Sequence, residues 1–435
     1  GHADADLHTD AAAGPDHRAD GHHRNRLIVH IDYLSLTNFR NYARLESPIP
    51  NAPVVIHGAN AQGKTSLLEA IYYLATSRSP YTTSDRQLLN WATEDSPLPF
   101  ARIAAEINSL RAGMNRLEIT IMLETQADGA RRFRKSIRLN GVDKRVMDVI
   151  GVINVVLFLP RDLTLIEGSP ADRRHFMDVT LTQVEAGYAA ALDQYERTLP
   201  QRNALLRRIS ENQASPKELD YWDDQLATAG ATLIAERQRF LRELELEAQR
   251  NHYDLTGRKE TLTLRYQPSF MPTAGGNGQL SFDVLGLDLH RDLDPAEVQP
   301  QFTAQLRAEQ DESLRRGVTL SGPHRDELRL LINGRDAGLY GSRGQARTAV
   351  MALKLAEREW MRSRIGEYPI LLLDEVAAEL DAERRAFLLE RIDGSTQVLV
   401  TTTELDIFTE SFLKRAALWE VTEGRITVKS RDAGG

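Results

Sequence analysis

The sequence contains no cysteine and no long hydrophobic run. The absence of cysteine excludes a disulfide framework and any zinc site built on cysteine pairs. The longest apolar run, Val152 to Leu159, is much shorter than the roughly 20 residues that a membrane-spanning helix needs. The N-terminal segment also lacks the basic start and apolar stretch of a signal peptide, so we expect a cytoplasmic protein with no membrane segment.

The sequence also has no excess of positive charge. The chain has 54 lysines and arginines against 62 aspartates and glutamates, which gives a net charge of -8. This balance argues against a protein that coats nucleic acid through bulk charge, but it leaves room for a local basic face. With 41% hydrophobic and 27% charged residues over 435 positions, the composition predicts a globular chain of two or three structural units.

Residues 1–26 are rich in Ala, Asp and His and show no apolar periodicity. We therefore predict a disordered tail. Metal binding by His17, His22 and His23 is the functional alternative, but these histidines have no fixed spacing on a helix or strand.

Short alternating apolar runs from Leu27 onward predict β-strands. The expected strands cover 27–33, 34–36, 54–56, 102–107, 116–123 and 133–139, and the last is followed by a hairpin turn at Asn140-Gly141. Strand patterns return at 328–332, 370–373, 398–401 and 418–422, after a Gly- and Pro-rich stretch at 267–294 that we expect to form loops around a short strand.

The chain between Pro170 and about Arg250 has a helical pattern instead. Apolar residues recur close to heptad spacing over 188–209 and again over 219–240, which predicts an antiparallel helical hairpin or small bundle with Pro200 as a kink or break. The simplest organisation is an α/β core in two pieces, 27–165 and 311–435, with a mostly helical arm, 166–310, inserted between them.

The first motif with chemical meaning lies between a strand and a helix. Gly58-Ala59-Asn60-Ala61-Gln62-Gly63-Lys64-Thr65 matches the P-loop pattern G-x-x-x-x-G-K-[ST]. Its backbone N–H groups would surround phosphate oxygens, Lys64 would reach the β- and γ-phosphates, and the Thr65 hydroxyl would bind Mg²⁺. The strand, loop and helix order disfavours a chance match in a loop, so we predict that 58–66, Ser66 included, bind ATP.

A second pattern joins an apolar strand to two carboxylates. Ile370 to Leu373 is typical of a central parallel strand, and Asp374 and Glu375 follow at its C-terminal end, where doubly wound sheets bind ligands. This is the Walker B pattern, in which Asp374 would hold Mg²⁺, directly or through water, and Glu375 would polarise the attacking water. Glu375 and Lys64 are therefore the predicted catalytic residues. The alternative is that the two carboxylates only cap the next helix.

Ser342-Arg343-Gly344-Gln345 precedes a long helical pattern through Trp360 and lies at a helix N-terminus, a geometry that faces phosphates. It stands one helix ahead of the Walker B strand, where ABC ATPases have their signature motif. In that family type the signature of one subunit contacts the γ-phosphate on the P-loop of another. This implies an ATP-dependent homodimer with Ser342, Gly344 and Gln345 at the nucleotide. Glu379-Leu380-Asp381 resembles the D-loop of that interface, and a plain polar helix start is the alternative.

From about Ile31 to the C-terminus the chain resembles the RecF family of bacterial recombination mediators. The most specific stretch runs from Pro160 to Asp178. Other matching segments are Leu36 to Tyr42, Gly58 to Tyr72, Gln201-Arg202-Asn203, Ser321 to Glu327, Ser342 to Gln345 with Arg347, and Asp374 to Asp381. The resemblance implies an α/β fold, a P-loop ABC-type ATPase head split in sequence by an inserted, mostly helical arm domain.

Two positions depart from the expected pattern. Ala378 stands where the family often has Ser, and Thr401-Thr402-Thr403 stands where many ABC ATPases have a switch histidine. The γ-phosphate sensor is therefore unassigned, and slow hydrolysis fits this departure.

The resemblance implies an ATP-dependent DNA-binding protein of DNA repair, replication and the SOS response. It would act at single-strand gaps and stalled forks, hydrolyse ATP slowly under DNA stimulation, and help load recombinase with RecO and RecR. Paired heads would form a cleft whose cations contact the DNA backbone without reading bases. The candidates are Arg131, Arg132, Arg134, Lys135 and Lys144, and for each a solvated charged face is the alternative.

Three competing functions follow from the same motifs. An SMC or Rad50 type ATPase needs a very long heptad insertion, and Rad50 also needs a cysteine hook, which this chain lacks. The nucleotide subunit of a membrane transporter would need a full signature motif and a switch histidine. A DNA-binding module whose hydrolysis only times release stays open, and Thr401 to Thr403 favour it.

Overall fold

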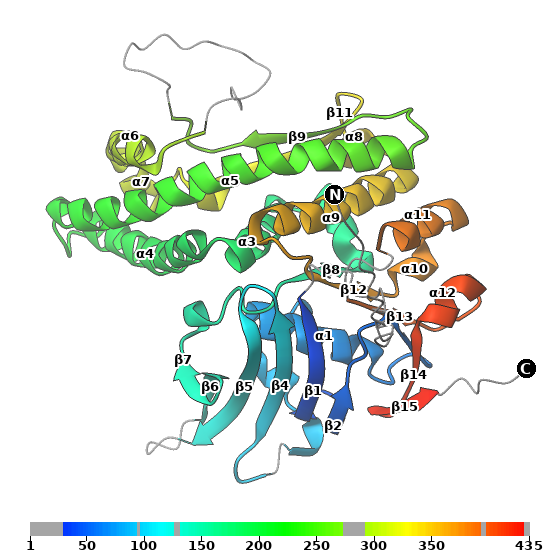
Figure 1. Cartoon of the computed structure of the whole chain (residues 1–435). Helices are drawn as coiled ribbons and strands as arrows, with labels where there is room; N and C mark the ends of the chain where they lie inside the picture. The colour runs from blue at the N-terminus through cyan, green and yellow to red at the C-terminus, as the bar shows by residue number, and fades with distance from the viewer. Residues whose placement is uncertain (1–28, 94–95, 126–130, 273–291, 393–396, 430–435) are drawn as a thin grey trace, which may run out of the picture.

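Sheets form one half of the molecule and long helices the other (Figure 1). This computed structural model describes residues 29–93, 96–125, 131–272, 292–392 and 397–429. The predicted tail and its three histidines lie outside the described residues, as does most of the predicted loop region at 267–294.

A mostly parallel sheet joins the two ends of the chain. Its order is β15-β14-β3-β13-β12-β8, and only β15 is antiparallel to its neighbour. The strands are β3 (Val54–His57), β8 (Val155–Phe158), β12 (Ile370–Asp374), β13 (Val398–Thr402), β14 (Ala417–Thr422) and β15 (Arg425–Lys429). Because β3 lies between β13 and β14, the N-terminal and C-terminal pieces build one sheet. The predicted split α/β head is confirmed.

Alternate residues of this sheet face two different hydrophobic clusters. Ile370 and Leu372 belong to the cluster that includes α1 (Lys64–Thr76), whereas Leu371 and Leu373 belong to the cluster that includes α9 (Arg343–Ile365). Every residue of β3, β12 and β13 is buried, as expected for parallel strands covered on both faces. The loops at the carboxyl ends of these strands are thereby fixed to a rigid base.

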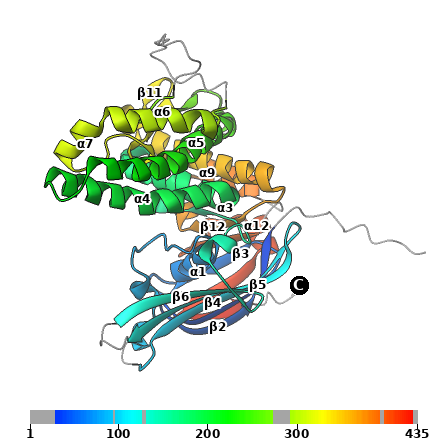
Figure 2. The same ribbon diagram turned by 90° about the vertical axis from the view of Figure 1, so that its left-hand side faces the viewer.

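An antiparallel sheet in the order β2-β1-β4-β5-β6-β7 lies on the outer side of α1 (Figure 2). Its strands are β1 (His30–Phe39), β2 (Tyr42–Pro48), β4 (Phe100–Ser109), β5 (Gly113–Thr125), β6 (Arg131–Leu139) and β7 (Val142–Lys144). The two strands expected at 27–36 form the single strand β1. The expected turn at Asn140-Gly141 joins β6 to β7, with φ of 53° and 80°, respectively.

The arm contains the expected antiparallel helical hairpin. It consists of α4 (Ala186–Ser210) and α5 (Leu219–Leu255), preceded by α3 (Pro170–Val184). Arg202 bonds Asp223, while Tyr188, earlier in α4, bonds Arg237, later in α5, so the two helices run in opposite directions. The prediction that Pro200 breaks its helix is wrong. Pro200 and the residue one turn before it are exposed, so water can satisfy the carbonyl that proline leaves unpaired.

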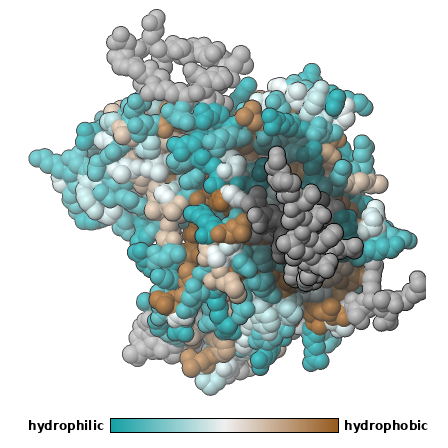
Figure 3. All heavy atoms as spheres, in the orientation of Figure 1, coloured by the Kyte–Doolittle hydropathy of each residue, from teal (hydrophilic) through white to brown (hydrophobic). Residues whose placement is uncertain are grey.

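Shorter elements complete the described part of the chain. A small sheet in the order β11-β10-β9 comprises β9 (Leu262–Gln267), β10 (Glu327–Ile332) and β11 (Arg335–Asp336). The remaining α-helices are α2 (Thr164–Glu167), α6 (Pro295–Ala308), α7 (Gln310–Arg316), α8 (Ala337–Tyr340), α10 (Val376–Glu379), α11 (Ala382–Ile392) and α12 (Glu410–Arg415). Within the described ranges, no helix combines the length and hydrophobicity that crossing a bilayer requires. Hydrophilic residues cover most of the visible face in Figure 3.

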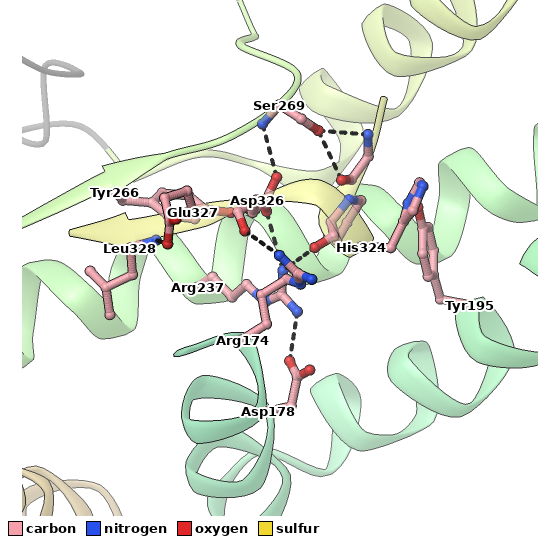
Figure 4. A network of polar contacts seen from close by, with 12 residues as sticks. Arg174, Asp178, Tyr195, Arg237, Tyr266, Ser269, His324, Asp326, Glu327 and Leu328 are labelled. Carbon is pink, nitrogen blue, oxygen red and sulfur yellow. Dashed lines mark hydrogen bonds and ion pairs between the residues drawn. The ribbon is translucent and has the colours of Figure 1, made fainter. Parts of the chain in front are cut away.

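A buried polar network holds the helical half together (Figure 4). The Arg237 guanidinium donates to Asp178 at 2.7 Å and to Asp326 at 3.2 Å, and both Arg237 and Asp326 are almost fully buried. Arg173 forms two bonds to Glu327, at 2.7 and 2.8 Å. Removing one partner of a buried ion pair costs about 3–5 kcal/mol. The two family-like segments, 160–178 and 321–327, therefore meet in one structural network far from the P-loop in sequence.

Candidate nucleotide-binding site

The P-loop connects β3 to α1, and two of its glycines are required by the packing around them. Gly63 has φ of 117°, and a Cβ there would lie 2.4 Å from the Asn41 side chain. Gly58 has φ of 151°, and a Cβ there would lie 2.4 Å from the Val421 carbonyl oxygen. Neither position can accept a side chain without displacing its neighbour. The backbone N–H groups of the loop and the start of α1 are thus held in place for an anion.

A cavity of about 380 Å³ opens beside this loop. Its lining comprises Arg40, Asn41, Ala61, Gly63, Lys64, Thr65, Ser66, Gln87, Leu89, Trp91 and Glu375. P-loop residues and the second Walker B carboxylate line one part, and a separate segment, 87–91, lines another. The structure thus brings six of the predicted residues to one cavity, namely Ala61, Gly63, Lys64, Thr65, Ser66 and Glu375. The lining does not include Gly58, Ala59, Asn60, Gln62 or Asp374. Their roles stay predictions.

Lys64 is the buried cation of the site. Its side chain is 3% exposed. The ammonium group donates to the carbonyl oxygens of Gly58 and Ala59 at 2.9 and 3.1 Å and lies 3.2 Å from a Glu375 carboxylate oxygen. The carbonyl contacts bend the P-loop around the lysine. The ammonium therefore lies at the centre of the loop, where it can meet phosphate oxygens.

Three hydroxyl groups converge on the Asp374 carboxylate. Thr65 and Thr401 donate to one oxygen at 3.0 and 2.7 Å, and Tyr81 donates to the other at 2.6 Å. Burial, followed by the Asp374 charge, raises the pKa of the Tyr81 hydroxyl, so Tyr81 keeps its proton and acts as a donor. The Asp374 side chain is thus fixed from three directions.

The same oxygens suit Mg²⁺. Thr65 and Asp374 offer a hydroxyl and a carboxylate 3.0 Å apart, and Mg²⁺ prefers such oxygen ligands while taking the rest of its shell from water and phosphate. No cluster of three or more His, Cys, Asp or Glu residues suited to a metal occurs in the part of the chain that is described. A site with one protein carboxylate fits a metal that is shared with a nucleotide.

Glu375 has an unusual backbone conformation. Its φ of 55° is left-handed, which costs roughly 1–2 kcal/mol in a residue with a side chain. The Thr401 hydroxyl accepts the Glu375 backbone N–H at 2.9 Å and donates to Asp374, so it stabilises this turn. Glu375 is the N-cap residue that precedes α10, but its side chain makes no capping bond, which counts against the alternative that it only caps the next helix.

Residues that the sequence motifs did not reveal buttress the P-loop from both ends of the chain. Asn41, in the turn between β1 and β2, donates to the Gln62 carbonyl at 2.7 Å, and Tyr42, the first residue of β2, donates to the Gly63 carbonyl at 3.0 Å. In the turn between β14 and β15, the Glu423 N–H donates to the Gln62 side chain at 2.7 Å. The segment Leu36 to Tyr42 carried a family signal, but only the fold shows what it contacts.

The signature segment lies apart from this cavity. Ser342 caps α9, as expected, and its hydroxyl accepts the Gln345 N–H at 3.2 Å. Ser342, Arg343 and Gly344 are exposed, and none of Ser342, Gly344 or Gln345 lines the P-loop cavity. The Gln345 side chain donates to Glu260 at 2.7 Å. One chain therefore does not bring its own signature and P-loop together.

The segment resembling a D-loop is joined to the signature helix. Arg347 of α9 donates to the Glu379 carbonyl at 3.1 Å, and its guanidinium lies 3.6 Å from the Glu379 carboxylate. Asp381 accepts the Arg384 N–H at 2.9 Å. These contacts link the turn after Walker B to the start of α9.

The basic candidates for DNA contact differ in their surroundings. Arg132, Arg134 and Lys144 are exposed. Lys135 instead donates to the Ser77 carbonyl at 2.9 Å and lies 3.2 Å from an Asp85 oxygen. Lys135 therefore has a packing role against the end of α1.

Comparisons with known proteins agree with the fold. A family model described as the RecF/RecN/SMC N terminal domain matches residues 30–427. The protein named DNA replication and repair protein RecF from Chloroflexus aurantiacus is 40% identical over 408 residues, which are 92% of this chain and 99% of that protein. Its namesake from Herpetosiphon aurantiacus is 40% identical over 406 residues, with the same two shares. The RecF of Halalkalibacterium halodurans is 36% identical over 403 residues, 92% of this chain and all of that protein.

Two solved structures are similar over nearly the whole chain. One is described as the recombination mediator protein RecF with ATP in the RecFOR pathway, with a TM-score of 0.77, 27% identity, and coverage of 94% of this chain and 100% of that one. The other is described as RecF with ATPrS, with a TM-score of 0.78, 26% identity, and coverage of 93% and 99%.

Proposed function

The chain belongs to the RecF family of DNA replication and repair proteins, and from this premise we propose that it is an ATP-dependent DNA-binding recombination mediator. The observation that carries the proposal is the division of the nucleotide site. P-loop residues and Glu375 of one chain line a common cavity, whereas Ser342 and Gly344 of the signature motif are exposed and no residue of that motif lines the cavity.

Each residue of the P-loop side has a proposed role. Bound ATP would supply the phosphates, and Mg²⁺ would supply positive charge that offsets theirs. Lys64 and the backbone of 58–66 hold the phosphates, and Thr65 and Asp374 hold the metal. Glu375, at the rim of the same cavity, orients and polarises the attacking water.

The signature motif acts on the nucleotide of a second copy. Ser342, Gly344 and Gln345 lie at the N-terminus of α9, where the helix dipole favours an anion. Since they are outside their own cavity, a second copy places them at its γ-phosphate, and ATP then joins two heads. The contacts from Arg347 to Glu379 make the D-loop segment part of the same interface.

Hydrolysis is slow and serves to time release. Thr401-Thr402-Thr403 stands where a switch histidine is expected, and the Thr401 hydroxyl is committed to Asp374 and to the Glu375 backbone. It therefore supports the carboxylates and adds no further base. DNA stimulates this hydrolysis.

The paired heads contact the backbone of DNA at single-strand gaps and stalled forks in the cytoplasm. Arg132, Arg134 and Lys144 are the exposed candidates, and RecR, with RecO, connects the complex to recombinase loading. The proposed boundaries are 27–165 and 311–435 for the head and 166–310 for the arm. Within the described residues the arm's longest helix is α5, with 37 residues, and this disfavours an SMC or Rad50 type of function.

The proposal is tested with a gapped DNA duplex and an uninterrupted duplex of equal length, each with and without ATP and Mg²⁺. We expect the protein to retain DNA only when ATP is present, and to retain more of the gapped duplex than of the uninterrupted one. Binding should weaken steeply from the lower to the higher of two salt concentrations, because contacts to the DNA backbone release counterions. Retention that is independent of ATP would contradict the proposal. Equal retention of both duplexes would contradict its specificity for gaps.

A further inference from the structure

An exposed tryptophan lies at the rim of the nucleotide cavity and has no part in the roles given so far. Trp91 is 81% exposed, although it lines the same cavity as Lys64 and Thr65. Two of the other tryptophans, Trp360 and Trp419, are at most 2% exposed. A single apolar surface residue is ordinary, but one that borders a phosphate-binding cavity can bind the apolar part of the ligand.

The segment that carries Trp91 is fixed to the turn that carries Arg40. The Arg40 N–H donates to the Leu88 carbonyl at 2.8 Å, and the Asn90 N–H donates to the Asn38 carbonyl at 2.8 Å. Phe39 and Leu89 also form an isolated β-bridge. Two segments distant in sequence thus form one rigid rim, and Trp91 is presented from it rather than from a free loop.

The guanidinium of Arg40 is also part of this rim, and its edge is already occupied. It donates twice to Glu69, at 2.8 and 2.7 Å, and once to the Gln87 carbonyl, at 2.9 Å. These bonds lie in the plane of the group and use its edge, and Arg40 also lines the cavity, so its flat face is the part left for stacking. Arg40 also has φ of 52°, a costly conformation that the bond to Leu88 and the pairing of β1 with β2 maintain.

We propose that Trp91 and Arg40 bind the base of the nucleotide by stacking, and that this stacking favours purine nucleoside triphosphates. The inference rests on the proposed function, since it assigns the part of the ATP cavity away from the phosphates. An indole and a flat guanidinium both stack on aromatic rings. A purine offers a larger face than a pyrimidine. Stacking alone discriminates weakly between adenine and guanine, because every base has such a face.

The test compares ATP with inorganic tripolyphosphate, which has the phosphates but no base. Trp91→Ala should weaken ATP binding about tenfold, as expected for the loss of one stacking partner, and should leave tripolyphosphate binding unchanged. Trp91→Phe should restore most of the loss. Met114→Ala, which removes another exposed side chain outside the cavity lining, is the matched control and should bind both ligands normally.

Arg40→Lys separates stacking from charge. Lysine keeps the positive charge but has no flat face, so we expect weaker ATP binding with tripolyphosphate binding unchanged. ATP should also quench tryptophan fluorescence in the wild type but much less in Trp91→Phe. An equal loss of both ligands in Trp91→Ala, or no loss of ATP, would overturn the inference. If the wild type itself fails to bind ATP, the proposed function fails instead, so the two failures are distinguishable.

Discussion

The two halves of the proposed nucleotide site differ in how they are held. The P-loop is bonded by the turn after β1, by the turn after β14 and by its own lysine, and three hydroxyl groups fix the adjacent Asp374. The signature segment has its own cap and one side-chain bond to Glu260, and Leu339 and Tyr340 just before it are 70% and 73% exposed. The first half is preorganised for a ligand, and the second is exposed as an interface is before assembly.

This difference predicts an order of events. The preorganised half can bind nucleotide in a single chain, because its contacts are internal. Under the proposed function, the exposed half would contact nucleotide only when a second copy arrives. Variants in the first half should therefore impair binding or chemistry, whereas variants in the second should impair pairing alone.

The largest expected effect separates ATP hydrolysis from ATP binding in the half that contains the P-loop. Glu375→Gln should lower the steady-state rate of ATP hydrolysis by about 10²–10⁴, because it removes the group that polarises water. ATP binding should persist, and dimers should accumulate because hydrolysis no longer releases them. Glu410→Gln, which changes an exposed carboxylate of α12, is the control for the charge. Loss of ATP binding in Glu375→Gln would remove the role given to Glu375.

The second largest effect tests whether ATP binding by the P-loop half is required before two copies can pair. Lys64→Met should weaken ATP binding by about 10–100-fold, as expected for the loss of a charged hydrogen bond, and should abolish pairing at moderate ATP concentrations. Calorimetry measures the affinity, and Lys414→Met, which changes an exposed lysine of α12, is the control. Normal pairing without ATP binding would break the proposed order.

A third variant tests the second half alone. Ser342→Arg should leave the ATP affinity of the monomer within about twofold of the wild type, because Ser342 is not in the cavity lining, while pairing weakens by about tenfold or more, since an unpaired charge is buried. Analytical ultracentrifugation measures the pairing. Dimers of normal stability would count against the contact between copies.

The smallest expected effect tests whether a hydrogen bond from outside the P-loop helps to hold it in the shape that binds ATP. Asn41→Ala removes the bond to the Gln62 carbonyl and should weaken ATP binding about fivefold, the effect of roughly 1 kcal/mol. Asn115→Ala, which removes local bonds in an exposed turn, should not alter it. An unchanged affinity in Asn41→Ala would mean that the P-loop keeps its shape without this buttress.

Local patterns in the sequence predicted the parts of the site that are contiguous. The P-loop and the Walker B strand each span a few consecutive residues with fixed spacing, and the heptad pattern predicted the hairpin of α4 and α5. Tyr81 could not be found this way, because it meets Asp374 across 293 positions. Asn41 and Trp91 likewise reach the site only when the antiparallel sheet β2-β1-β4-β5-β6-β7 folds against the P-loop.

The elements that the sequence analysis missed or predicted wrongly can also be explained physically. β2 was not predicted, because only three of its residues are buried and its polar residues obscure the alternation. β8 was not predicted either. It lies within the longest apolar run, where apolar and polar residues do not alternate because all four strand residues are buried. Pro200 was read as a possible break, but its exposed position lets α4 continue. Local propensity does not reveal which face of an element meets water.

The most direct test of the central claim mixes two defective variants. Lys64→Met keeps its signature and loses its P-loop, whereas Ser342→Arg keeps its P-loop and loses its signature. Each alone should remain monomeric with ATP and Mg²⁺. Their mixture should form a dimer with one intact composite site, detected by solution mass with one partner labelled. No heterodimer under conditions in which the wild type pairs would contradict a site assembled from two copies.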